Sequence, residues 1–151
     1  ISSNILNIYT KCEDLSFLKD LTLKTMPGDN SCMFHAIACA VRWKYNVDAP
    51  TIRKHVARYM VENAKALSKI LAWSPEALHA HVVKLQNVNT YGETIDLFVI
   101  ASLYNLTIKL YDADRRESTK FAPSMQLPDV IKLDHSIAYL HFSKNHYNVY
   151  V

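Results

Sequence analysis

A cysteine that follows a polar turn has the clearest potential for covalent chemistry in this sequence. Cys32 comes directly after the turn residues 27–31, and the apolar side chains after it repeat at the three- and four-residue spacing of a helix. Because Asp29, Asn30 and Ser31 are all types that cap helices, we expect the helix to begin at the cysteine. Unpaired backbone N–H groups and the helix dipole at that end favour a thiolate. The segment therefore predicts a nucleophilic thiol that requires a base.

The last six residues contain a candidate base and a residue that could orient it. Alternation in residues 146–151 predicts a strand, in which His146 and Asn148 share one face and Tyr147 points toward the core. The Asn148 carbonyl could accept a hydrogen bond from one imidazole nitrogen of His146, which leaves the other nitrogen for a nucleophile. Cys32, His146 and Asn148 therefore form a candidate Cys–His–Asn triad, which only the fold can assemble because the cysteine is distant in the sequence.

Helical patterns precede strand patterns along the rest of the chain. Capping signals predict that helices open at Asp48-Ala49-Pro50, Ser74-Pro75-Glu76 and Tyr91-Gly92-Glu93. Alternating patterns predict strands at residues 21–26, 106–110, 136–142 and 146–151. The first of these helices is expected to run to Leu67 and the last to end at Asn105, whereas residues 112–119 are expected to form a polar turn and residues 121–133 to be irregular. This order of elements predicts an α+β domain.

Size and composition are those of one folded domain. The chain has 151 residues and a mass of 17.3 kDa; half of the residues are hydrophobic and 21% are charged. We therefore expect residues 1–151 to form a single domain, in which residues 1–20 are a weakly informative N-terminal extension. The formal net charge is +3 with acids and bases interspersed, which argues against a nucleic-acid partner. No apolar run reaches the roughly 18 residues needed to cross a membrane, so no membrane partner is expected.

The cysteines and histidines do not predict a disulfide framework, a metal or another cofactor. Cys12, Cys32 and Cys39 form an odd and sparse set, which favours a reducing compartment, and we expect a cytoplasmic protein. His79 and His81 could chelate a metal, but without a third ligand nearby both are expected on the surface of a helix. The chain begins with Ile and not with Met, so we expect a monomeric domain that is part of a larger parent protein.

Three segments resemble, in the right order, the motifs of the ovarian-tumour (OTU) family of cysteine peptidases, which are deubiquitinases. Residues 27–37 resemble the nucleophile motif, the segment from Tyr91 to Ile108 the middle segment, and residues 146–149 the terminal His-aromatic-Asn/Asp motif. The resemblance implies a papain-like OTU fold, with helices packed on a small, mostly antiparallel sheet and the catalytic cysteine at the N-terminus of a central helix. The short frame is similar to viral or intracellular-bacterial members, which would place the protein in a host cytoplasm.

The resemblance implies a role for each residue of the two end motifs. Cys32 would be the nucleophile, His146 the general base and then the general acid, and Asn148 the residue that orients His146. Asp29 would brace the turn before the cysteine. The backbone N–H groups of Asn30 and Cys32 would then donate to the developing oxyanion.

The resemblance also implies a channel for the ubiquitin tail, flanked by Tyr91, Gly92 and Asn145. Two positions depart from the family's pattern. The family usually has glycine where this chain has Asn30; because asparagine tolerates positive φ better than other non-glycine residues, we expect the turn to survive. The family usually has tryptophan where this chain has Tyr91, which keeps an aromatic side chain in the channel wall.

The implied activity is hydrolysis of the isopeptide or peptide bond after the C-terminal glycine of ubiquitin or a ubiquitin-like modifier, through a thioester on Cys32. Ubiquitin or polyubiquitin would be the partner, and no cofactor is implied. Two alternatives stay open: a catalytically weak module that binds ubiquitin, and a peptidase that processes its own parent polyprotein. Ubiquitin binding without hydrolysis would favour the first alternative, and cleavage of flanking sequence would favour the second.

Overall fold

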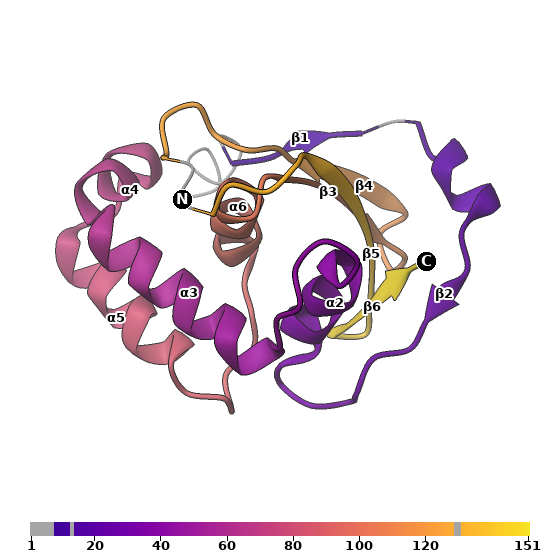
Figure 1. Ribbon diagram of the computed structural model, residues 1–151, viewed down its shortest axis with the longest axis horizontal. Coiled ribbons are helices and arrows are strands. Elements are labelled where there is room, and N and C mark those ends of the chain that lie inside the picture. Colours follow the sequence, from indigo (N-terminus) through magenta and orange to yellow (C-terminus); the bar gives the residue numbers. More distant parts are fainter. Residues whose placement is uncertain (1–7, 13, 129–130) are drawn as a thin grey trace.

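The computed structural model describes residues 8–12, 14–128 and 131–151 of the chain. One mixed sheet runs through the molecule, and the α-helices lie on one side of it (Figure 1). The first seven residues of the predicted N-terminal extension lie outside the described part.

The sheet has six strands in the order β1-β4-β3-β5-β6-β2. They span Thr10–Lys11 (β1), Leu23–Lys24 (β2), Leu106–Asp112 (β3), Glu117–Phe121 (β4), Ser136–Ser143 (β5) and His146–Tyr150 (β6). β3 and β5 pair in parallel, with Leu106 opposite Ser136, whereas every other neighbouring pair is antiparallel. The expected mostly antiparallel sheet is therefore confirmed, and the predicted longer strands are β3, β5 and β6.

Four helices begin where capping residues predict them: α2 (Cys32–Val41), α3 (Ala49–Glu62), α5 (Pro75–Leu85) and α6 (Thr94–Leu103). The other described helices are the 3-10 helix η1 (Ser16–Asp20) and α4 (Ala64–Leu71). The Asp48 side chain accepts a hydrogen bond from the Thr51 N–H at the start of α3. The Ser74 hydroxyl accepts one from the Ala77 N–H at the start of α5. After α6, Asn105 takes the expected left-handed conformation, with φ at 52°.

Two local predictions were wrong. The helix expected to run to Leu67 breaks at Asn63, whose Nδ2 donates at 3.0 Å to a carbonyl one turn earlier and so competes with the helical backbone. Residues 117–121, expected as turn and irregular chain, form β4 and pair with β3 across a tight turn. The strand was missed because only Ser118 and Phe121 among these residues are buried, which leaves no regular alternation in the sequence.

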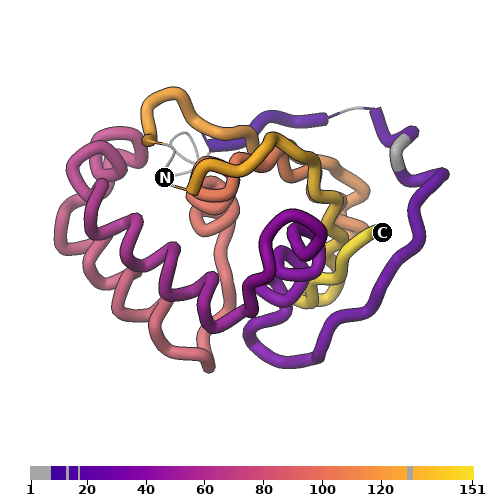
Figure 2. The backbone as a smooth tube through the Cα atoms, in the orientation of Figure 1, coloured from indigo at the N-terminus to yellow at the C-terminus, as the bar shows by residue number. Residues whose placement is uncertain are grey.

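Helix α2 lies at the centre of the molecule, between β6 and α3 (Figure 1, Figure 2). Its side chains Cys32, Phe34 and Ile37 are at most 1% exposed. Residues 95–103 of α6 are all buried as well, so both helices belong to the core that the sheet covers. The position of α2 confirms the expected central helix that begins at Cys32.

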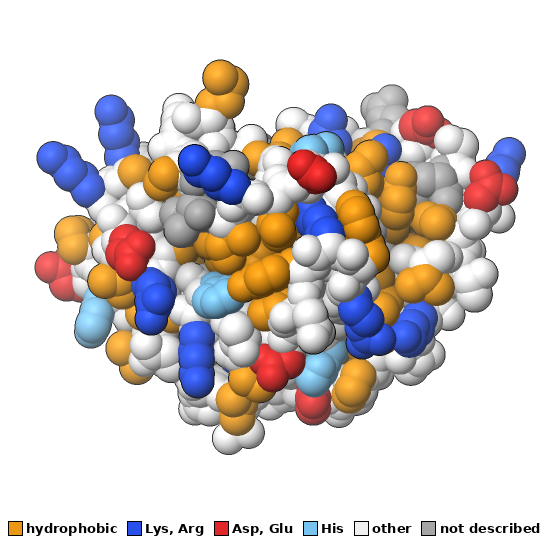
Figure 3. All heavy atoms as spheres, viewed as in Figure 1, with side chains coloured by type: hydrophobic (Ala, Val, Ile, Leu, Met, Phe, Trp, Pro, Cys, Tyr) orange, Lys and Arg blue, Asp and Glu red, His pale blue; other side chains and the backbone are white. Residues whose placement is uncertain are grey.

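Charged side chains are interspersed on the face shown in Figure 3, where basic and acidic groups surround a central apolar area. This distribution agrees with the mixed charge pattern of the sequence. No helix within the described residues is both long enough and apolar enough to span a lipid bilayer.

Candidate active site

The fold brings the candidate nucleophile against the last strand. Cys32 is the first residue of α2 and is 1% exposed. Its Sγ accepts a hydrogen bond from the backbone N–H of Tyr147 at 3.4 Å, although the two residues are 115 positions apart. The two end motifs of the sequence therefore meet, with the thiol beside the residue that follows His146.

His146 begins β6 and lies opposite Ser143 in the β5–β6 pair. Its side chain is half-buried, and within residues 8–12, 14–128 and 131–151 its ring forms no hydrogen bond with Cys32 or Asn148. The Oδ1 of Asn148 instead accepts from the Met26 N–H at 2.8 Å. Met26 follows β2, which pairs with β6, so the amide joins β6 to the segment that leads to the nucleophile. The expected hydrogen bond between Asn148 and His146 is thus not formed in this structure.

The turn before His146 is held by a carboxylate from another hairpin. Lys144 and Asn145 have φ values of 51° and 60°, which is the twist that two-residue hairpins require and which a lysine adopts at some cost. The Asp114 carboxylate accepts from the Ser143 hydroxyl and from the Lys144 N–H, both at 2.7 Å. These two hydrogen bonds hold the pKa of Asp114 below its usual value. Asp114 was missed because the sequence places it only in a polar turn.

Asp29 forms several of the contacts that define the turn before Cys32. Its Oδ1 accepts from the Ser31 N–H at 2.9 Å, and its Oδ2 lies 3.1 Å from the His35 Nε2. Desolvation opposes ionisation, but the hydrogen bonds from His35 and Ser31 prevail and keep the pKa of Asp29 below its usual value. The Asp29 carbonyl accepts from the Cys32 N–H at 3.3 Å, so one of the two expected oxyanion donors is engaged within the turn.

Asn30 links the turn before Cys32 to a second loop. The described non-glycine residues with positive φ do not include Asn30, so the turn forms without using the tolerance of asparagine for that conformation. Its Nδ2 instead donates to the Asn89 carbonyl. The asparagine therefore supplies a donor between the turn before Cys32 and the loop that precedes Tyr91.

The Tyr91–Gly92 corner packs against the start of α2. A Cβ placed on Gly92 would lie 2.2 Å from the Met33 Cε, 2.8 Å from the Met33 Sδ and 3.2 Å from the Phe34 ring. Close approach therefore favours glycine here, because a Cβ would displace the end of the Met33 side chain, and no positive φ is involved. Tyr91 beside it is 57% exposed, and Asn145 is exposed on the β5–β6 turn. The structure thus places the three predicted channel residues on the two loops beside α2 and β6.

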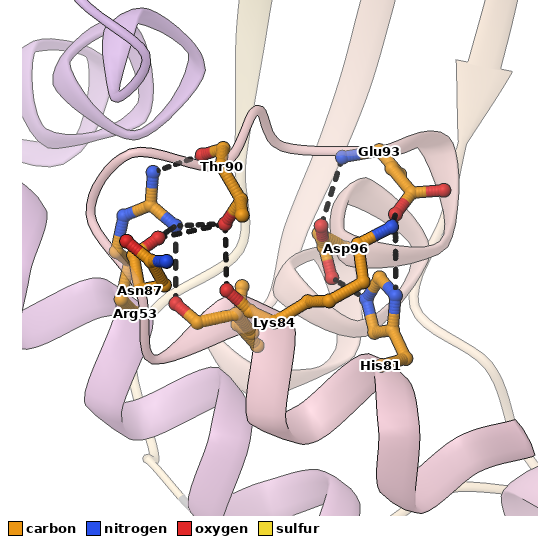
Figure 4. A network of polar contacts seen from close by, with 8 residues as sticks. Arg53, His81, Lys84, Asn87, Thr90, Glu93 and Asp96 are labelled. Carbon is orange, nitrogen blue, oxygen red and sulfur yellow. Dashed lines mark hydrogen bonds and ion pairs between the residues drawn. The ribbon is translucent and has the colours of Figure 1, made fainter.

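A buried ion-pair network holds the loop after Gly92 (Figure 4). His81 contacts the Asp96 carboxylate at 2.7 Å and the Glu93 carboxylate at 3.3 Å, and Asp96 accepts from the Glu93 N–H. Burial opposes the charged imidazole, but these carboxylates raise the pKa of His81 to about 9. The expected surface position is correct for His79 and wrong for His81, which is 6% exposed.

Three buried polar residues on apolar helix faces were missed: Arg53, His81 and Asp96. Each lies three or four residues from buried hydrophobic side chains of its own helix and so interrupts an apolar stripe. Arg53 lies between Ala49 and Val56, His81 lies between Leu78 and Leu85, and Asp96 precedes Val99. A polar residue in such a stripe must find partners inside the fold. That interruption was the signal available in the sequence.

Comparison with known proteins places this site in a family. A sequence model of OTU-like cysteine proteases matches residues 27–147. OTU domain-containing protein 5-A of Xenopus laevis is 27% identical over 97 residues, which are 64% of this chain and 18% of that protein. OTU domain-containing protein 5 of Homo sapiens is 26% identical over 93 residues, which are 62% of this chain and 16% of that protein. The chain thus spans less than a fifth of the length of these curated relatives.

Solved structures have the same fold. The viral OTU domain protease from Dera Ghazi Khan virus gives a TM-score of 0.72 at 15% identity, covering 96% of this chain and 90% of that chain. An OTU domain in complex with ubiquitin gives a TM-score of 0.66 at 20% identity, covering 96% of this chain and 77% of that chain. These likenesses confirm the predicted OTU fold. The chain belongs to the family of OTU-like cysteine proteases.

Proposed function

We propose that this chain is a cysteine-type deubiquitinase, which hydrolyses the bond after the C-terminal glycine of ubiquitin or a ubiquitin-like modifier. The observation that carries the proposal is the 3.4 Å contact between the Tyr147 N–H and the Cys32 Sγ, which aligns a buried thiol with the strand that bears His146. Membership of a family of cysteine proteases supports it. A neighbouring OTU domain was solved in complex with ubiquitin, which supports ubiquitin as the partner.

The proposed reaction begins at the thiol. His146 accepts the Cys32 proton, and the sulfur attacks the carbonyl carbon of the terminal glycine. The resulting oxyanion takes hydrogen bonds from the backbone N–H groups of Asn30 and Cys32. Collapse of this intermediate breaks the C–N bond, and His146 donates its proton to the departing lysine amine. The acyl group is then a thioester on Cys32, which a water molecule activated by His146 hydrolyses to a free carboxylate.

Substrate binding must complete two contacts in this scheme. The His146 ring has to turn toward the Cys32 sulfur, as in many free enzymes whose catalytic hydrogen bonds tighten only in the complex. The Cys32 N–H has to exchange the Asp29 carbonyl, 3.3 Å away, for the oxyanion. Asn148 supports His146 by anchoring β6 to Met26, and Asp29 braces the turn.

The proposed binding channel suits a tail that ends in glycine. In this proposal Tyr91 and Gly92 would line one side and Asn145 the other, and the absence of side chains at the end of the tail would suit a narrow channel. We further propose that the domain acts as a monomer in the cytoplasm. Its three cysteines are free, which is compatible with a reducing compartment.

A ubiquitin probe with an electrophilic C-terminus tests the proposal. We expect covalent labelling of the wild-type protein and none of Cys32→Ala. An unlabelled wild-type protein, or a labelled Cys32→Ala variant, would overturn the assignment. A panel of diubiquitin linkages and ubiquitin-like modifiers then identifies the preferred substrate.

A ubiquitin-binding module without turnover is the second candidate, because the described residues include no hydrogen bond between His146 and Cys32. The same probe separates the two functions. Ubiquitin binding by calorimetry together with an unlabelled Cys32 would favour the binding module.

A further inference from the structure

Arg53 carries a buried charge without a carboxylate partner. It lies in α3, is 2% exposed, and no carboxylate of the described residues lies within ion-pair distance of its guanidinium. Its donors go instead to backbone carbonyls and hydroxyls, among them the oxygens of Asn87 and Thr90 (Figure 4). The guanidinium carbon also lies over the Phe34 ring, 4.4 Å from the ring centroid. Burying a cation is costly unless its donors are satisfied, so this arrangement depends on the position of every acceptor.

One side of the guanidinium holds the turn before the nucleophile. Nε donates to the Ser31 hydroxyl at 3.1 Å, and Nη2 donates to the same oxygen at 3.0 Å. Nη2 also donates to the Asn30 carbonyl at 3.1 Å. These contacts fix the two residues that directly precede Cys32.

The other side holds the loop between α5 and α6. Nη2 donates to the Thr90 carbonyl at 2.6 Å, and Nη1 donates to the carbonyls of Leu85 and Asn87 at 3.0 and 3.3 Å. Longer contacts of 3.5 Å reach the Val88 carbonyl and the Thr90 hydroxyl. The loop thus held leads directly into Tyr91 and Gly92.

An apolar residue could not take over the contacts of this arginine. Without the guanidinium, the carbonyls of Asn30, Leu85 and Thr90 would lose their donor, which destabilises buried acceptors. No apolar side chain could bind two loops at once, whereas the planar fork of an arginine offers five donors in fixed directions. The contacts therefore indicate that the residue sets the geometry of both loops as well as contributing to stability.

We propose that Arg53 is a positioning residue for the hydrolysis, and this inference rests on the proposed function. By holding Asn30 and Ser31 against Thr90, it fixes the distance between the oxyanion donors and the channel wall at Tyr91 and Gly92. The glycine carbonyl of the substrate must sit within reach of both. A misplacement of about 1 Å at such a site can reduce turnover by about 10²-fold.

Steady-state kinetics on a fluorogenic C-terminal ubiquitin substrate test this role. We expect kcat of Arg53→Lys and Arg53→Met to fall by about 10²-fold, while KM changes much less. The matched control is Lys44→Met, because Lys44 is also a cation that donates to backbone carbonyls. Its Nζ lies 3.3 Å from the Tyr104 carbonyl oxygen and 2.7 Å from the Asp134 carbonyl oxygen. All variants are assayed under conditions in which circular dichroism shows them to be folded. The control should retain wild-type kcat.

Ser31→Ala keeps the test decisive if the Arg53 variants do not fold. It removes the hydroxyl that accepts from Nε and Nη2 at a half-buried position, and kcat should fall by about tenfold, roughly the worth of one hydrogen bond to a charged donor. If the double variant Ser31→Ala/Arg53→Lys folds, its loss of kcat, expressed as free energy, should be smaller than the sum of the two single losses. Wild-type kcat in Ser31→Ala, or in a folded Arg53→Lys variant, would overturn this inference and leave the proposed function intact. A wild-type protein that does not turn over the substrate would overturn the proposed function with it.

Discussion

The two halves of the proposed site are held in different ways. On the nucleophile side, Arg53 and Asn30 bind the loop at residues 87–90, and Gly92 packs against α2. On the histidine side, His146 follows a two-residue turn that depends on the pairing of β5 with β6 and on Asp114. Cys32 is buried whereas His146 is half-buried. In the proposed reaction the sulfur would therefore stay in place and the imidazole would make the adjustment.

Loss of the His146 imidazole should reduce kcat more than any other change. Comparing it with the loss of the Asn148 amide distinguishes the proposed base from the residue that anchors its strand. His146→Ala removes the proposed base, so kcat should fall about 10³-fold, within the range of general acid–base catalysis. Asn148→Ala keeps the ring but removes the acceptor of the Met26 N–H, so a smaller loss of kcat should accompany a loss of about 1 kcal/mol in unfolding free energy. Enzyme kinetics and urea unfolding measure both. An Asn148→Ala protein of unchanged stability would contradict the anchoring role.

Overpacking at the corner tests how rigid the nucleophile side is. Gly92→Ala introduces a Cβ against Met33 and Phe34, so the buried Met33 side chain or the loop must shift, and we expect a loss of about 1–3 kcal/mol in stability and a fall of about tenfold in kcat. Gly28→Ala is the stability control, because a Cβ there meets no atom within 4 Å. Urea unfolding compares the two variants. Equal stability of both would show that the corner yields easily and that the two sides do not differ as described.

The hairpin brace is expected to matter less, because backbone pairing also supports His146. Asp114→Ala removes the acceptor of two hydrogen bonds, so the Lys144 amide should exchange its hydrogen faster and kcat should fall by about tenfold. The pKa of Asp114 lies below its usual value, so its contribution to stability is present above the unfolded pKa and is lost as the pH falls through the folded pKa. Asp20→Ala, at an exposed acid remote from the hairpin, is the control. Unchanged amide exchange in Asp114→Ala would refute the brace.

The His81 network should affect stability with pH and leave turnover of the folded enzyme nearly unchanged. Because folding raises the pKa of His81 from 6.5 to about 9, its stabilising contribution is complete below about pH 6.5 and is lost as the pH rises to about 9. The unfolding free energy should fall by up to about 1.4 kcal/mol for each pH unit in that window. Urea unfolding across pH 6–10 measures this fall. A His81→Gln variant with the same pH dependence as wild type would exclude the network as its source.

Elements and end motifs could be predicted because they leave a local pattern in the sequence. Asp48 and Ser74 cap their helices with their own side chains, and the alternation of β5 and β6 reflects one buried face. Cys32 was placed at a helix N-terminus for the same reason. Its approach to β6 needed the fold, which the family resemblance implied and the contact from the Tyr147 N–H shows.

Contacts between distant elements could not be predicted from local patterns. The acceptors of Arg53 lie 22–37 positions away, and Asp114 reaches a turn 29–30 positions away, so no periodicity reports them. Asn30 shows how a local argument can mislead, because its conformational preference was considered and its reach to Asn89 was not. The burial of Arg53 and His81 could have been predicted from the sequence, since each interrupts an apolar stripe of its helix.

The contact between the Cys32 sulfur and β6 also sets the order in which the proposed activity can arise during synthesis. Ribosomes release the chain from its N-terminus, so α2 emerges long before the strand that faces its thiol, 115 positions later. The bond from Met26 to Asn148 spans 122 positions and forms equally late. A nascent chain or a fragment without residues 146–150 holds the cysteine without the proposed base His146. The proposed activity therefore requires that β6 has joined the sheet.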